Sequence, residues 1–179
     1  SEEYLLRKTG EAVLSSLRSL TLTIDTNISP VVHIGFVMPD LAELRFERGS
    51  TLASFRDLGA SLKNIRVLWV SACGIQHLDG VGALAGLEEL YLAFNDVEDL
   101  TSLAMNERLE IDLRHFDKRV VDLESNNVGD PDQAMQLGMC PRLWSLTLIA
   151  NPICRLEHYR RMVVEAVPTL ASLDEHEVT

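Results

Sequence analysis

The chain has 179 residues, 46% of them hydrophobic, which is enough for one domain with a continuous core or for one short repeat array. Its formal net charge of −11 disfavours nucleic acid as the main partner, because nucleic-acid binders carry basic patches or stripes. The sequence has no run of 18 apolar residues, and two glutamates follow Ser1, so it predicts neither a membrane span nor a signal peptide. Its three cysteines lack C-x-x-C spacing and favour a reducing compartment.

The first segment, residues 1–16, is expected to be a helical lead-in or N-terminal cap. Leu5, Leu6, Val13 and Leu14 have partly helical spacing within it. From Leu17 onward the apolar residues follow the pattern L-x-x-L-x-L instead. This pattern starts at positions 17, 41, 65 and 87, in steps of 24, 24 and 22 residues. The sequence therefore predicts a repeat array after the lead-in.

The two clearest copies of the repeat lie at 65–75 and 87–97, and both fit L-x-x-L-x-L-x-x-N/C-x-L. This spacing is the signature of a leucine-rich repeat, in which each coil supplies one short strand and a return segment. A single coil cannot bury its apolar face alone, so neighbouring coils are needed. We therefore expect an α/β leucine-rich repeat solenoid over residues 17–153, with about six coils and a parallel β-sheet on its concave face. The motif residues of the two copies are Ile65, Leu68, Val70, Cys73 and Ile75, then Leu87, Leu90, Leu92, Asn95 and Val97.

The fifth coil departs from this period. Leu109 begins on time, but Val121, Leu123, Asn126 and Val128 complete the motif only if residues 111–119 are an insertion. These nine residues are either a bulge inside or beside a strand, or an error in the gene prediction. The sixth coil, which starts at Leu143 and ends at 153, restores the pattern.

The segments outside the strands also have interpretable patterns. Residues 154–179 are expected to form a C-terminal cap, with apolar residues at helical spacing before Pro168. The return segments are too short for full helices, so we expect short 3₁₀ or helical turns on the convex side. The leucines and valine that should pack inward from those turns are Leu78, Val81, Leu84, Leu100 and Leu103.

Strand alternation predicts which residues are free to bind a partner. Positions 1, 4 and 6 of the motif point into the core, so positions 3, 5 and 7 point to the concave face. Trp69 and Tyr91 should then lie side by side on adjacent strands, about 4.8 Å apart. They either shield the sheet and one another or anchor a partner, and the surrounding acids favour a basic or amphipathic helix or a basic loop. The predicted partner-binding residues are Arg45, Glu47, Val67, Trp69, Glu89, Tyr91, Phe94, Asp122 and Glu124.

No pattern in the sequence indicates catalysis or a cofactor. Gly80, Gly82 and Gly86 have the wrong spacing for a dinucleotide loop and fall on a return segment. The five histidines lack metal-ligand spacing, and no nucleophile is paired with a base at a predicted strand end. We therefore expect no enzyme activity, no cofactor and no metal.

Several runs are more particular than the leucine frame, which many repeat proteins share. They are RDLG-x-SL at 56–62, VLW-V-x-x-CGI at 67–75, DLES-NNV at 122–128 and CPRLW-x-LTL at 140–148. With them, positions 41–174 resemble the ciliary leucine-rich repeat proteins of the outer-dynein-arm assembly and transport type, and residues 4–40 do so more weakly. The order Asn-Pro-x-Cys, Tyr-Arg, Pro-x-Leu and Leu-Asp near the C-terminus resembles the cap of the short-repeat intracellular class. Residues 111–119 depart from that family's uninterrupted repeat.

This resemblance implies a non-catalytic adaptor for assembly, transport or docking of outer dynein arms in motile cilia. It implies coiled-coil adaptor proteins and outer-arm dynein subunits as partners, and a location in the cytoplasm and the cilium or flagellum, including the axoneme. A permanent axonemal subunit is a second reading. A regulatory subunit of a phosphatase or another enzyme is an alternative from a different class, and an RNA-processing scaffold is disfavoured by the acidic faces. Neither nucleic acid nor membrane is expected as a partner.

Overall fold

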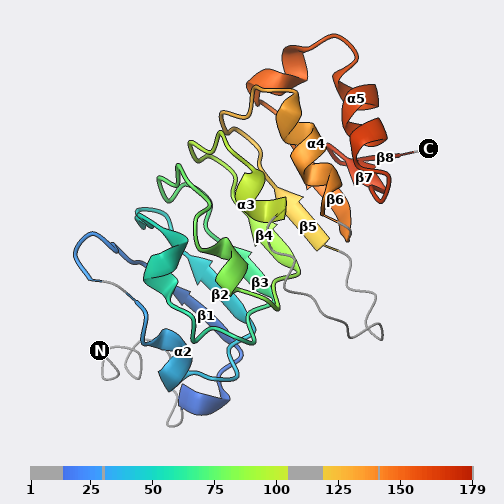
Figure 1. Cartoon of the computed structure of the whole chain (residues 1–179). Coiled ribbons are helices and arrows are strands. Elements are labelled where there is room, and N and C mark those ends of the chain that lie inside the picture. Colours follow the sequence, from blue (N-terminus) through green and yellow to red (C-terminus); the bar gives the residue numbers. More distant parts are fainter. Residues whose placement is uncertain (1–13, 30, 105–118, 141, 179) are drawn as a thin grey trace.

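The computed structural model describes residues 14–29, 31–104, 119–140 and 142–178. Most of the expected lead-in (1–16), Leu109 and residues 111–118 lie outside this part of the chain. Six parallel strands follow one another in a single sheet, and their order in space is their order in sequence (Figure 1). They are β1 (Ser19–Leu22), β2 (Glu43–Phe46), β3 (Val67–Trp69), β4 (Glu89–Tyr91), β5 (Arg119–Asp122) and β6 (Leu143–Thr147).

The leucine frame sets the register of these strands. Leu44 pairs with Leu68 and Leu68 with Leu90, so the fourth motif positions form one continuous row across the sheet. These three side chains are at most 3% exposed, whereas the residues next to each of them in its strand are exposed or half-buried. Burial of such a row requires every neighbouring coil, because each leucine is covered by the next. The predicted leucine-rich repeat solenoid with a parallel sheet is confirmed.

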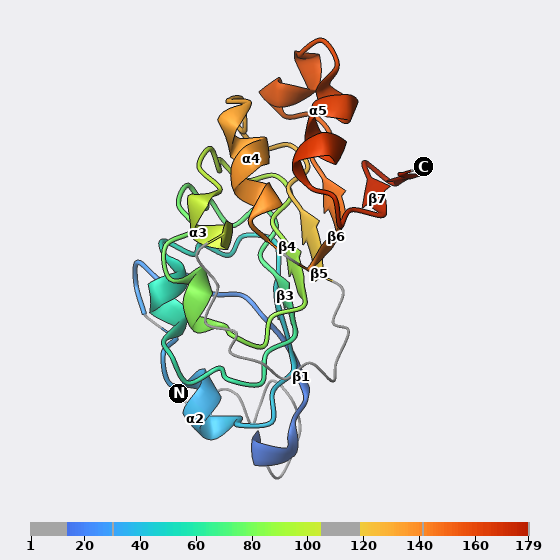
Figure 2. The same ribbon diagram turned by 45° about the vertical axis from the view of Figure 1, so that its right-hand side comes forward.

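Short helical turns cover the other side of the sheet, opposite the outward-facing strand residues (Figure 2). The expected inward packing is confirmed, since Leu78, Val81, Leu84, Leu100 and Leu103 are all buried. In chain order the turns and helices are η1 (Leu14–Ser16), α2 (Ile34–Val37), η2 (Phe55–Leu58), η3 (Val81–Ala83), α3 (Thr101–Ala104), α4 (Asp132–Gly138), η4 (Pro152–Arg155) and α5 (Tyr159–Ala166).

Three buried asparagines at the ninth motif position join each coil to the coil before it. The Oδ1 atom of Asn126 accepts from the backbone N of Val97, and its Nδ2 donates to the backbone O of Leu92. Asn151 does the same with Val128 and Leu123. Each asparagine thereby satisfies backbone groups that the strands leave unpaired where they end.

The fifth coil keeps the register despite its extra residues. Glu89 pairs with Val120, and Tyr91 with Asp122, as the motif alignment predicts. Arg119, which the sequence reading placed at the end of the insertion, is the first residue of β5. On the β6 side the register shifts between Arg119 and Val120, where β6 advances two residues, from Leu143 to Ser145, for one residue of β5.

The C-terminal segment extends the sheet, which the sequence reading did not foresee. Strand β7 (Ser172–Leu173) pairs parallel to β6, and β8 (His176–Glu177) pairs antiparallel to β7. Between β6 and β7, helix α5 buries Val163 and packs beside α4 (Figure 1). Asp174 follows β7, and its Oδ1 accepts from the backbone N of Leu148 at 2.8 Å. This carboxylate therefore joins the end of β7 to the backbone that follows β6.

Candidate functional site

The outward-facing residues of positions 3, 5 and 7, which we call the concave face, lie in the predicted columns. The central column runs from Arg45 through Trp69 and Tyr91 to Asp122, each paired in register with the next. Arg45 and Glu47 are exposed. The other strand residues of the predicted set are half-buried, and they are Val67, Trp69, Glu89, Tyr91, Asp122 and Glu124.

Three side chains of the central column form one continuous stack. The rings of Trp69 and Tyr91 are parallel within 5°, with centroids 5.2 Å apart. The guanidinium carbon of Arg45 lies 5.7 Å from the centroid of the Trp69 ring, within the range of a cation–π contact. The two faces of Trp69 are thus occupied by Arg45 and by Tyr91. Such contacts hold large rings upright on a sheet whose neighbouring side chains are small or acidic.

The Tyr91 hydroxyl is fixed by an acid on its own strand. It donates to Oε2 of Glu89 at 2.7 Å. Burial raises the pKa of Tyr91 to about 12, with further contributions from the hydrogen bond to Glu89 and from the charges of Glu89 and Asp122. The phenol therefore stays protonated and donates this hydrogen bond at neutral pH.

Acidic side chains surround this stack. The Oδ1 atom of Asp122 accepts from the backbone N of Glu124 at 2.9 Å, which orients its carboxylate along β5. Glu47 accepts from the Thr23 hydroxyl at 2.8 Å. Within the described ranges no lysine, arginine or histidine forms an ion pair with Glu89, Asp122 or Glu124. Among the described residues, the negative charge of these three carboxylates is therefore not neutralised by an ion pair.

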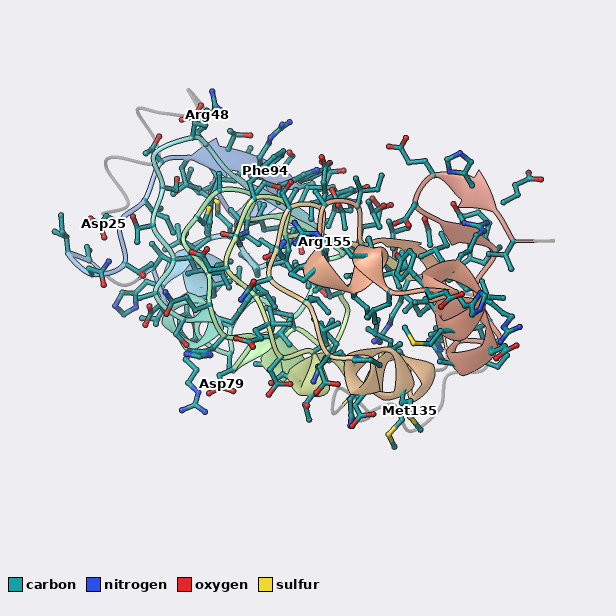
Figure 3. All side chains as sticks on the ribbon, turned by 90° about the horizontal axis from the view of Figure 1, so that it is seen from above. Asp25, Arg48, Asp79, Phe94, Met135 and Arg155 are labelled. Atoms are coloured by element: carbon teal, nitrogen blue, oxygen red, sulfur yellow. The ribbon has the colours of Figure 1, made fainter. Side chains whose placement is uncertain are left out.

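Phe94 lies apart from the stack, where the strand ends. Its φ of 60° places it in the left-handed region, as do Ala72, Ser125 and Ala150 at the same motif position. These three are small or polar, whereas Phe94 is large and 59% exposed. In Figure 3 its label lies on the sheet side of the ribbon, opposite Met135 on α4. The structure thus adds Phe94 to the rim of the concave face and does not bring it into ring contact with Trp69 or Tyr91, going by the described residues.

A second surface feature was missed by the sequence reading. A polar groove of about 400 Å³ lies at the edge where the strands begin, and Arg18, Lys63 and Arg66 line it together with Asp40 and Glu88. Arg66 forms an ion pair with Glu88. The sequence signal for this groove was that Arg18 and Arg66 both occupy motif position 2, in the first and third coils. The columns predicted to be exposed include only positions 3, 5 and 7.

The cysteines have the environment of packing residues. Cys73 is 1% exposed, and burial raises the pKa of its thiol to about 11, so it stays protonated at neutral pH. Among residues 14–29, 31–104, 119–140 and 142–178, no three histidine, cysteine or acidic side chains are grouped as a metal site would need. In the same ranges no helix is long and apolar enough to cross a membrane.

Comparison with known proteins gives relatives of one repeat class. No protein-family model matches the chain. It is 37% identical to leucine-rich repeat-containing protein 56 of Homo sapiens over 97% of this chain and 33% of that protein. It is 30% identical to the leucine-rich repeat-containing protein 56 homolog of Trypanosoma brucei brucei over 100% of this chain and 26% of that protein. The chain therefore spans about a third or less of the length of these curated relatives.

The solved structures agree on the fold. An internalin from Listeria monocytogenes superposes with a TM-score of 0.56 over 96% of this chain and 54% of that chain, at 17% identity. Parallel-sheet solenoids of this type present extended concave surfaces to other proteins. The repeat frame, the parallel sheet and these relatives together show that the chain is a leucine-rich repeat protein with the architecture of a protein–protein interaction module.

Proposed function

We propose that the chain is a non-catalytic adaptor whose concave face binds a basic or amphipathic segment of a partner protein. The observation that carries this proposal is the Arg45–Trp69–Tyr91 stack beside acids that have no cationic partner among the described residues. The stack is ordered before a partner binds, so little side-chain entropy is lost on association. Tryptophan, tyrosine and arginine are also the residue types that dominate interface hot spots.

The charge of the face restricts the partner further. Glu89 and Asp122 lie next to Tyr91, and Glu124 follows Asp122 by two residues, so an acidic partner segment is repelled and a basic one is attracted. Val67 and Val120 are half-buried on either side of Glu89 and supply apolar contact area. An amphipathic helix or a basic loop satisfies both requirements.

We further propose that this adaptor acts in assembly, transport or docking of outer dynein arms. The support is the resemblance of the runs at 67–75, 122–128 and 140–148 to ciliary proteins of that type. The expected partners are coiled-coil adaptor proteins and outer-arm dynein subunits, and the expected location is the cytoplasm and the cilium. The chain spans about a third of the length of the human relative, so this proposal concerns the repeat segment alone.

The test is capture of partners from a ciliated-cell extract with the 179-residue chain and two variants. Trp69→Ala removes the centre of the stack, and Met135→Ala changes a 68% exposed residue on the opposite side (Figure 3). We expect the wild type to capture dynein-arm subunits or coiled-coil proteins, Trp69→Ala to weaken capture by about 30-fold, and Met135→Ala to leave it unchanged.

Two outcomes would contradict these proposals. Equal capture by the wild type and Trp69→Ala would exclude the concave face as the binding surface. Capture of a phosphatase catalytic subunit in place of ciliary proteins would replace the dynein role with the regulatory one. A high-salt wash of cilia then distinguishes a transported adaptor, which is released, from a permanent axonemal subunit, which is retained.

A further inference from the structure

The stack on the concave face has one end without a ring or a cation among the described residues. Arg45 covers one face of Trp69 and Tyr91 covers the other, so the series ends at the face of Tyr91 that is turned toward β5. The next residue in this column is Asp122, and the one after it is Thr147. Both are half-buried. The open end of the stack is therefore followed by two short side chains.

We call the face of Tyr91 that is turned toward β5, together with Asp122 and Thr147 beyond it, the notch. Side chains of a sheet stand roughly perpendicular to it, and a tyrosine reaches several ångströms farther from the backbone than an aspartate or a threonine. The outer part of the Tyr91 ring thus rises above the carboxylate of Asp122. This ring forms the wall of the notch, and Asp122 and Thr147 form its floor. Glu124 flanks it on the side of Phe94, and Val120 flanks it on the side of Glu89.

The charges in the notch are those that a cation requires. The face of an aromatic ring is the negative part of its quadrupole, and a carboxylate beside it adds to the same negative potential. The structure describes no cation paired with Asp122 or Glu124. At the other end of the same stack the chain places Arg45 on a ring face. The chain thus shows on Trp69 the contact that the open face of Tyr91 lacks.

We propose that the notch beside Tyr91 binds an arginine side chain of the partner segment. The guanidinium stacks on Tyr91 and donates to the carboxylates of Asp122 and Glu124, while the aliphatic stem lies along Ile149, which is 38% exposed. Arginine fits better than lysine because a planar, forked guanidinium stacks on a ring and binds carboxylates at the same time. This proposal rests on the proposed function in one respect, because it assumes that a partner protein supplies the arginine.

The probe is an N-acetylated pentapeptide amide with arginine at its centre and alanine elsewhere. Counterparts with lysine or citrulline at the centre test charge and shape, since citrulline has nearly the shape of arginine without its charge. Titration into the isotope-labelled chain is followed by the amide resonances of Tyr91, Asp122 and Glu124. We expect these resonances to shift with the arginine peptide, to shift less with the lysine peptide, and to stay in place with the citrulline peptide.

Variants locate the binding. Asp122→Asn keeps an oxygen acceptor for the backbone N of Glu124 and removes only the charge, and Tyr91→Leu removes the ring. Each variant should lower the affinity for the arginine peptide about fivefold. Asp79→Asn, which changes an exposed acid on the opposite side (Figure 3), should alter affinity less than about twofold. Equal binding of the arginine and citrulline peptides, or equal loss with Asp79→Asn and Asp122→Asn, would overturn the proposal.

The same variants separate this proposal from the proposed function. If Trp69→Ala abolishes partner capture but Asp122→Asn does not, and the arginine peptide fails to bind, the concave face binds partners without this notch. If the peptide binds in the notch but no concave variant alters partner capture, the notch exists and the proposed binding surface is wrong. Circular dichroism of each variant confirms that the repeat fold is retained.

Discussion

The side chain of Asn95 connects its own coil to the coil of Cys73, because its Oδ1 accepts a hydrogen bond from the backbone N of Cys73 at 3.0 Å. The same oxygen accepts from the backbone N of Ile75 at 3.0 Å. Its Nδ2 donates to the backbone O of Val70 at 2.9 Å and of Leu92 at 2.8 Å. One buried amide thus satisfies four backbone groups in two coils.

Asn95→Ala should lower the free energy of unfolding by roughly 3 kcal/mol, because it leaves several buried backbone groups without partners. Urea unfolding followed by circular dichroism measures this loss. Asn127→Ala is the matched control, since this side chain is exposed, and it should change stability by less than about 0.5 kcal/mol. Similar losses in both variants would show that the bonds between coils contribute little.

Stability at high pH should depend on Tyr91. The pKa of Tyr91 is raised to about 12 in the folded chain from its usual 10.0, so the folded chain keeps this proton where the unfolded chain loses it. The resulting stabilisation is complete below pH 10 and is lost as the pH rises to about 12. Tyr91→Phe should therefore lose less stability than the wild type over that window. Urea midpoints across the window, together with tyrosinate absorbance, test this, and parallel curves for the two proteins would contradict it.

Replacing Phe94 by asparagine should stabilise the fold. Its φ is 60° and its side chain is 59% exposed, so the chain bears the cost of a left-handed backbone at a bulky residue without burying the ring. Phe94→Asn should raise the free energy of unfolding by about 1 kcal/mol, because asparagine tolerates this conformation. Phe36→Asn is the control: it is 76% exposed on α2 and lacks a positive φ. A thermal melt should show a gain for the first variant alone.

If Phe94→Asn also weakens partner capture, the strained ring is retained for binding. That result would fit the tendency of backbone strain to persist at functional sites. Unchanged capture together with higher stability would instead remove Phe94 from the predicted partner-binding set.

The C-terminal end of the sheet should depend on Asp174. Its Oδ1 accepts from the backbone N of Leu148, and its Oδ2 accepts from the Tyr159 hydroxyl at 2.9 Å. Asp174→Ala should cost roughly 2 kcal/mol and speed hydrogen exchange at the amide of Leu148. Asp174→Asn, which keeps an acceptor for that amide, should cost less. Glu175→Ala is the control, because it also has a positive φ but is exposed.

The leucine spacing was sufficient to predict the sheet and its columns. Leu44, Leu68 and Leu90 recur every 22 to 24 residues because each must be buried. Burial of these leucines makes the alternate residues of each strand point to the concave face. The neighbourhood of Trp69 and Tyr91 follows from the same alignment. Their parallel stacking, the position of Arg45 over Trp69 and the Tyr91–Glu89 bond depend on rotamers, which the repeat pattern does not encode.

The leucine pattern did not predict the two strands of the C-terminal cap, β7 and β8. Ser172 and Leu173 form β7 beside β6, and of the leucine frame only Leu170 and Leu173 are present, which is too short a pattern to predict a further coil. The antiparallel β8 likewise depends on the turn at Asp174 and Glu175, where two consecutive residues have positive φ. Neither is glycine, so the usual turn signal is missing.

The preserved register across the irregular fifth coil has a consequence for divergence among relatives. Val120 follows Glu89 by 31 positions, whereas Glu89 follows Val67 by 22, yet both pairs are aligned in the sheet. Return segments can therefore gain or lose residues in the course of evolution while every concave side chain keeps its neighbours. Selection on the outer turns and selection on the binding columns then proceed independently, and relatives with different loop lengths can share one recognition surface.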